Sequence, residues 1–79
     1  MSARNKAHRL LKEAHYILWA RGGVSQSELA RRMGVARYQI QRDLSDLTAL
    51  FPIYEEDGTK RLRMNKVLFR RWWGKREQV

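Results

Sequence analysis

Cysteine is absent from this chain of 79 residues, and proline occurs only once. The lack of cysteine excludes disulfide bonds and thiolate metal sites. Long apolar runs are missing as well, since nothing approaches the roughly 20 apolar residues that span a bilayer. The apolar stretch nearest the start is broken by Lys12, Glu13 and His15, so it is no signal-peptide core. We therefore expect a soluble cytoplasmic protein with a single domain over residues 1–79 and modest stability.

Acidic residues are also scarce. Eight Asp and Glu face seventeen Lys and Arg, which gives a formal charge of +9. So large a positive charge on a small domain favours polyanionic partners. The basic residues concentrate in residues 60–79, which hold eight of them against one glutamate, whereas residues 22–58 hold four basic and six acidic residues. A basic disordered tail would have the same charge, but the 43% of hydrophobic residues recur periodically and favour a folded domain.

Apolar residues at steps of three and four predict a first helix over residues 4–20. Gly22 and Gly23 should end it, because glycine tolerates the left-handed conformation of a helix cap. The charged residues, Glu13 among them, are expected on the outer side. The face expected to be buried consists of Ala7, Leu10, Leu11, Ala14, Ile17 and Leu18.

Residues 25–50 contain two further runs with helical spacing, which meet at Gly34. Ser25 or Ser27 can cap the first run, and the second begins near Ala36, which is a poor cap. Two short helices joined by a tight turn form a helix-turn-helix. The stripe expected to be buried on the second helix is Ile40, Leu44, Leu47 and either Leu50 or Phe51.

A β-hairpin is predicted over residues 52–64. The dipeptide Asp57-Gly58 is a strong signal for a two-residue hairpin turn. Residues 61–64 then alternate basic and apolar side chains, as a half-buried strand does. Because a lone hairpin is marginally stable in water, it must lie against the helices, and Val24 could add a third short strand.

A final short helix is predicted over residues 65–74, with Asn65 as its cap and its end near Gly74. Its apolar side chains either cover the first helix and enlarge the core, or form a dimer contact, because Trp is enriched in interfaces. Stacking on single-stranded bases is a third interpretation, since arginines lie between the aromatic residues. The side chains concerned are Leu68, Phe69, Trp72 and Trp73.

The order of these elements is that of a winged helix-turn-helix, a mainly α fold with a small β-hairpin. Two stretches, "VSQSELARRMGVARYQIQRDLSDL" and "FPIYEEDGTKRLRM", resemble the N-terminal winged helix of DeoR-type and WYL-domain bacterial transcription regulators. The resemblance covers residues 24–64, which is more than half of the chain. It implies binding of double-stranded DNA, usually as a dimer, and control of transcription.

The chain departs from the family pattern in two respects. Ala36 stands where the family usually has a capping Ser or Thr. The chain also stops soon after the wing, where a sensor or dimerising domain follows in the family, so we expect either a fragment or a small free-standing regulator. Dimerisation would then depend on the residues present, and no small-molecule ligand is evident.

In a helix-turn-helix protein, the N-terminal part of the second helix contacts bases in the major groove. Here that helix offers Arg37, Gln41 and Arg42, and paired hydrogen bonds join Arg to guanine and Gln to adenine. We expect these three residues to contact bases. The expected contacts to the DNA backbone are Ser25, Gln26 and Ser27 at a helix N-terminus, Tyr38 on the second helix, and Lys60, Arg61 and Arg63 in the wing.

Structural roles are the alternative for several of these residues. Arg37 and Arg42 could be solvated or paired with Asp46. Asp43 could hold Arg31 or Arg32 of the preceding helix. The wing cations could simply protect an edge strand.

No catalytic constellation is visible. The carboxylates of residues 55–57 are expected to form a polar wing tip, because no His or Lys accompanies them. His8 and His15 share a helix face but lack further metal ligands nearby. We therefore expect no enzymatic activity, no metal and no cofactor.

The sequence thus predicts a nucleoid-associated transcription regulator, a repressor that binds a pseudo-palindromic site in double-stranded DNA as a homodimer. One alternative is an adaptor whose winged helix binds another protein, with "FRRWW" as the docking surface. Another is non-specific binding of nucleic acid in replication or repair.

Overall fold

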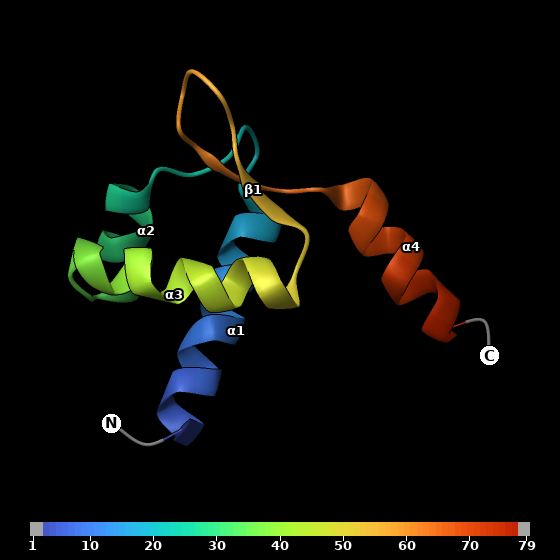
Figure 1. The fold of residues 1–79 in the computed structure, drawn as a ribbon, viewed down its shortest axis with the longest axis horizontal. Coiled ribbons are helices and arrows are strands. Elements are labelled where there is room, and N and C mark those ends of the chain that lie inside the picture. The colour runs from blue at the N-terminus through green and yellow to red at the C-terminus, as the bar shows by residue number, and fades with distance from the viewer. Residues whose placement is uncertain (1–2, 78–79) are drawn as a thin grey trace.

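Four helices and one antiparallel hairpin make up residues 3–77, the part of the chain that the computed structural model describes (Figure 1). The expected class, mainly α with a small β-hairpin in a winged-helix layout, is confirmed. Among these residues no helix combines the length and the apolar character needed to cross a bilayer. The elements are α1 (Ala3–Trp19), α2 (Gln26–Met33), α3 (Arg37–Leu50), β1 (Ile53–Glu55), β2 (Leu62–Met64) and α4 (Lys66–Glu77).

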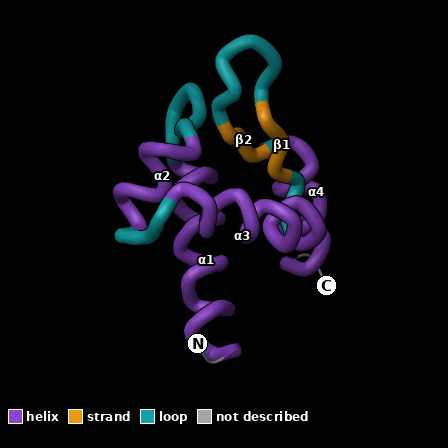
Figure 2. Tube along the Cα trace, turned by 60° about the vertical axis from the view of Figure 1, so that its left-hand side comes forward, coloured by secondary structure: helices purple, strands orange, loops and turns teal. Residues whose placement is uncertain are grey.

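The core lies where α1, α2 and α3 meet the base of the hairpin. In Figures 1 and 2, α3 crosses α1, α2 lies beside the N-terminal half of α3, and α4 lies at the opposite end of α3. Apolar side chains from five elements and from Val24, in the segment between α1 and α2, fill the centre. They are Leu10, Ala14, Ile17, Val24, Leu29, Ala30, Ile40, Leu47, Ile53, Leu62 and Met64.

The predicted signals at the ends of the helix pair are confirmed. The Ser25 hydroxyl accepts a hydrogen bond from the Glu28 backbone N–H at 3.1 Å and so caps α2. Gly34 ends α2 with a φ of 71°, a left-handed conformation that glycine adopts without strain. Ala36 precedes α3 without any side-chain cap hydrogen bond, as expected for alanine.

The first helix buries part of the expected face, since Leu10, Ala14 and Ile17 are buried and Leu18 is partly buried. Leu11 is 61% exposed and Ala7 is exposed, whereas Glu13, expected outside, is fully buried. α3 crosses α1 (Figure 1), and the buried residues of α1 are Leu10, Glu13, Ala14 and Ile17, so the stripe that begins at Leu11 lies on another side of the helix.

The expected two-residue turn at Asp57-Gly58 is wrong. Ile53 pairs with Met64, and the Glu56 N–H donates to the Arg61 carbonyl at 2.7 Å, so residues 57–60 form a four-residue loop. Tertiary pairing sets this register, because Leu62 exchanges two backbone hydrogen bonds with a residue preceding α2 and buries its side chain.

That residue is Val24, which forms the expected third short strand as a single bridge to Leu62. The preceding Gly23 allows the wing to approach closely. A Cβ at Gly23 would lie 2.9 Å from Cγ of Arg63 and 3.0 Å from the Leu62 carbonyl, and its φ of 86° is in the left-handed region. Glycine is therefore required where the wing meets the helix-turn-helix.

The last helix begins as expected and ends later. The Asn65 side-chain oxygen accepts a hydrogen bond from the Leu68 N–H at 3.1 Å, which confirms the cap. α4 then continues through Gly74 to Glu77, because glycine weakens a helix interior without preventing it. At the end of α3, Leu50 is 62% exposed, and Phe51 is the one that packs against the core.

Candidate nucleic-acid interface

The outer face of α3 is open to solvent along its first two turns. Arg37, Tyr38, Gln41 and Arg42 are all exposed there, and Tyr38 retains 61% of its accessible surface. α4 does not cover them, since it lies beyond the other end of α3 in both views (Figures 1 and 2). The three residues expected to contact bases and the tyrosine expected near the DNA backbone therefore share one accessible surface.

The charges of this face are not neutralised within the domain. The Asp46 carboxylate lies 3.0 Å from Nζ of Lys6, on α1, instead of pairing with Arg37 or Arg42. Within residues 3–77, no ion pair involves either arginine. Both guanidinium groups can therefore bind an external acceptor.

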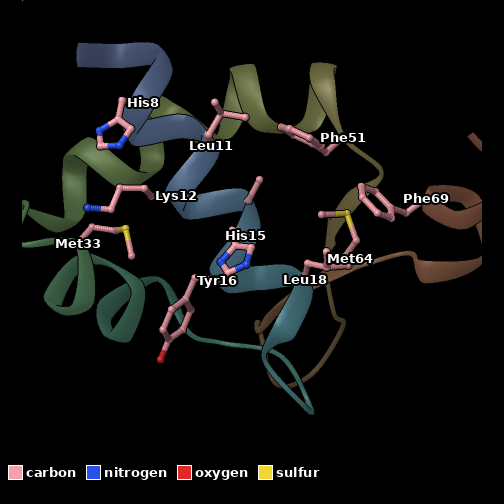
Figure 3. A pocket seen from close by; sticks show the side chains of 11 residues that line it. His8, Leu11, Lys12, His15, Tyr16, Leu18, Met33, Phe51, Met64 and Phe69 are labelled. Carbon is pink, nitrogen blue, oxygen red and sulfur yellow. The ribbon is translucent and has the colours of Figure 1, made fainter. Parts of the chain in front are cut away.

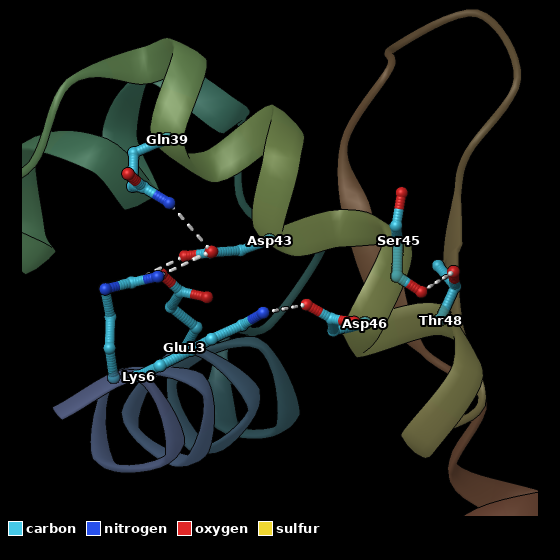
Figure 4. Close-up of polar contacts among 8 residues, drawn as sticks. Lys6, Glu13, Gln39, Asp43, Ser45, Asp46 and Thr48 are labelled. Atoms are coloured by element: carbon cyan, nitrogen blue, oxygen red, sulfur yellow. Dashed lines mark hydrogen bonds and ion pairs between the residues drawn. The ribbon is translucent and has the colours of Figure 1, made fainter. Parts of the chain in front are cut away.

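A buried polar cluster fixes α3 against α1 (Figure 4). Nε and Nη2 of Arg9 each donate to the Asp43 carboxylate at 2.8 Å, and the Gln39 amide donates to it at 3.0 Å. Glu13 lies beside this pair, with one oxygen 3.8 Å from Nε of Arg9. The expectation that Asp43 holds an arginine of α2 is thus wrong, because the side of α3 that bears Asp43 faces α1.

Burial changes the proton affinity of both carboxyl groups in this cluster. It raises the pKa of Glu13 to about 8, and the neighbouring Asp43 carboxylate adds to the effect because a protonated Glu13 can donate a hydrogen bond to it. Burial would also raise the pKa of Asp43, but hydrogen bonds from Arg9, Glu13 and Gln39 outweigh it and lower this pKa to about 2. At neutral pH the cluster thus holds one proton on Glu13 and one ion pair between Arg9 and Asp43.

The three residues expected to bind phosphate at the N-terminus of α2 differ in how accessible they are. Ser25 is occupied as the helix cap, and Ser27 is exposed. The Gln26 amide donates to the Glu55 carboxylate of the wing at 3.1 Å. Of the three residues expected at this helix end, Gln26 therefore lies beside an acidic group, and a phosphate would have to replace that contact.

Two of the three wing cations are exposed, and the third forms an ion pair. Lys60 and Arg61 are exposed in the loop and beside it, whereas Arg63 is half-buried and forms an ion pair with Glu56. A hydrogen bond from the Thr59 hydroxyl and a second from Arg63 hold the pKa of Glu56 below its ordinary value. Lys60 and Arg61 are the wing cations best placed to meet a polyanion.

The apolar side chains of α4 differ in their exposure to solvent. Phe69 is half-buried and packs against the core, while Leu68 and Trp72 are each 47% exposed. The rings of Phe69 and Trp72 lie 6.4 Å apart, tilted at 50°. The side chain of Trp73 lies outside the described part of the structure. Core packing thus accounts for Phe69 and leaves Leu68 and Trp72 open to solvent.

Together the fold and these surfaces define a winged helix-turn-helix domain in which the outer face of α3 exposes two arginines. Comparison of the chain with protein-family models, with curated proteins and with solved structures found no match. What the domain does must therefore be argued from its geometry and its charge.

Proposed function

We propose that the chain binds double-stranded DNA sequence-specifically and regulates transcription, as a repressor related to the DeoR-type and WYL-domain regulators. The observation behind this proposal is the outer face of α3, where Arg37, Gln41 and Arg42 are exposed and neither arginine forms an ion pair with another described residue. A major groove about 12 Å wide admits one such helix.

Each part of this surface has a separate task. The arginines and Gln41 would form paired hydrogen bonds with base edges, and Tyr38 would reach the sugar-phosphate backbone. Lys60 and Arg61 would neutralise phosphates beside the groove. The backbone N–H groups at the start of α2, together with Ser27, suit a further phosphate.

Alanine substitution at Arg37 or Gln41 should reduce sequence discrimination. Each lost bidentate contact removes roughly 1–3 kcal/mol of discrimination, or roughly 5- to 150-fold in the ratio of specific to random binding. The test begins with selection from a random duplex library, followed by titration of the selected and a random duplex at one salt concentration. Arg71→Ala is the matched control, because it removes the same charge from exposed α4 and should weaken both duplexes equally.

Two results would contradict the proposal. Equal affinity of the unaltered chain for selected and random duplexes would favour non-specific nucleic-acid binding. Unchanged selectivity in both alanine variants would remove the base-reading role of α3 and favour the adaptor function.

We further propose that the regulator acts as a homodimer through the surface where α3 ends beside α4. Leu50, Leu68 and Trp72 are exposed around a hollow there, and none of the described residues that line it is charged. Two copies can bury such a surface about a two-fold axis without opposing charges. Leu50→Glu should therefore give a monomer in a mass measurement, while the parent chain protects half-sites about 34–36 Å apart or a multiple of this. A monomeric parent chain would disprove the dimer.

A further inference from the structure

The first helix carries a second apolar stripe, which is largely exposed among the described residues, although Leu18 packs partly against the core. Leu11, His15 and Leu18 follow one another at steps of four and three, and Trp19 continues the stripe beside the His15 ring, 6.2 Å away. Leu11 is 61% and Trp19 is 71% exposed. This spacing is that of a helix face that packs against another helix.

The stripe forms the floor of an apolar groove (Figure 3). Met33 and Tyr16 lie at one side of the groove, and Phe51, Met64 and Phe69 lie at the other. The groove has a volume of about 630 Å³, and a second hollow of about 300 Å³ continues it past Leu18 and Phe69. From residue 8 to residue 19, α1 offers a surface roughly 16 Å long, or three helical turns.

The charge around this groove is of one sign. Its cations are Lys12 on α1 and, around the adjoining hollow, Lys66 and Arg70 on α4, and no carboxylate is among the described residues that line either. Beside the groove, the Glu28 carboxylate accepts a hydrogen bond from the hydroxyl of Tyr16, a lining residue, at 3.2 Å. An occupant must therefore be apolar in the middle and acidic at its flanks.

We propose that this groove binds an amphipathic helix of a partner protein, with its apolar face against the α1 stripe and its acidic residues beside Lys12, Lys66 and Arg70. A helix in a groove is a common mode of peptide recognition, with apolar anchors at steps of three and four. A second copy does not suit this groove, since α1 and α4, which supply its cations, are both rich in Lys and Arg.

This surface is separate from the proposed DNA interface. None of the residues that line the groove belongs to the outer face of α3 or to the wing loop, residues 57–60. A partner could therefore bind while DNA is bound. The inference does not depend on DNA binding, and either proposal can fail without the other.

The test uses synthetic helical peptides of about 15 residues, or roughly four turns. One peptide carries Leu and Phe on one face and Glu on the flanks; a second has Lys in place of each Glu, and a third is scrambled. We expect saturable one-to-one binding of the acidic peptide alone. Methyl resonances should shift at Leu11, Leu18, Met33 and Met64, and not at Leu29 or Ile40 in the core.

Variants locate the site. Leu11→Glu should weaken binding of the acidic peptide at least tenfold, and folding should be unaffected because the side chain is already exposed. Lys12→Glu should weaken it severalfold, whereas Arg21→Glu, the same charge change outside the groove, should have little effect. Both groove variants should bind DNA as the parent chain does.

Three results would overturn the inference. Equal binding of the Lys-containing peptide would show that charge does not select the occupant. Unaltered affinity after Leu11→Glu would place the site elsewhere. Dissociation of a dimer by Leu11→Glu, without peptide binding to the parent chain, would identify the occupant as a second copy.

Discussion

Replacing Arg9 with methionine should lower the free energy of unfolding at pH 7 by about 3 kcal/mol, because it leaves the buried Asp43 carboxylate without its cationic partner. Asp43 is 1% exposed, and Arg9 supplies two of its hydrogen bonds at 2.8 Å. The Gln39 amide at 3.0 Å and the proton of the neighbouring Glu13 would be its remaining donors. Methionine keeps the apolar stem of the arginine, so lost packing contributes little.

A loss of this size would be severe in so small a domain. At roughly 0.05–0.15 kcal/mol per residue, its whole stability amounts to between about 4 and 12 kcal/mol. Urea unfolding followed by circular dichroism measures the change, and the slope against urea should stay the same if the folded state is still compact. Because Asp43 belongs to α3, partial loosening of this helix in Arg9→Met should also reduce sequence discrimination on DNA.

The matched control lies one turn earlier on the same helix. Lys6 pairs with Asp46 of α3 at 3.0 Å, but both side chains are about half exposed. Water screens such a pair, so Lys6→Met should cost well under about 1 kcal/mol. Similar losses in the two variants would show that the buried cluster has no special role in joining α1 to α3.

The features that the sequence predicted correctly are those with a local cause. Ser25 and Asn65 cap helices through residues three positions away, and Gly34 ends α2 through its own backbone conformation. Such signals need no knowledge of the tertiary contacts. The exposed face of α3 is predicted in the same way, because the spacing of the apolar residues within this one helix indicates which side is buried.

The features that the sequence missed depend on residues far apart in the chain. Arg9 and Asp43 are separated by 34 positions, and nothing in either neighbourhood specifies the other. α1 has two stripes with helical spacing, and only the path of α3 decides that the one with Glu13 is buried and the one with Leu11 is not. A buried Glu is rare without a partner, so a prediction based on residue polarity puts Glu13 on the solvent side of α1.

The wing shows the same limit. Asp57-Gly58 locally favours a two-residue turn. The bridge between Val24 and Leu62 fixes a different strand register, in which the loop is two residues longer. The pairing of Arg63 with Glu56 then reduces the charge that the wing presents. The sequence alone places Arg63 with Lys60 and Arg61 among the cations expected to contact the DNA backbone.

Stability should fall as the pH rises from 5 to 8, because folding raises the pKa of Glu13 from about 4.5 to about 8. Between these values the folded state keeps a proton that the unfolded chain releases, so each pH unit costs up to about 1.4 kcal/mol. The stabilisation is complete below pH 4.5 and is lost by about pH 8. Over the range from 5 to 8 we expect a loss of roughly 2–4 kcal/mol in urea unfolding.

Asp43 sets the opposite limit at low pH. Its pKa is lowered from 3.8 to about 2, so its contribution is complete above pH 3.8 and is lost as the pH falls through 2. The two carboxyl groups of one cluster thus place the maximum of stability near pH 4 to 5. This lies below the range from about 5 to 8 in which most proteins are most stable.

Glu13→Gln isolates the contribution of Glu13. The amide is neutral at every pH and can still donate to Asp43, so the variant should show little change between pH 5 and 8 and should exceed the parent chain in stability at pH 8. His8 and His15 are both still present in the variant, so a difference in slope belongs to Glu13. Asp46→Asn, which neutralises an exposed acid of α3, should keep the slope of the parent chain. A parent chain whose stability is constant or rises from pH 5 to 8 would mean that Glu13 is ionised in the folded protein.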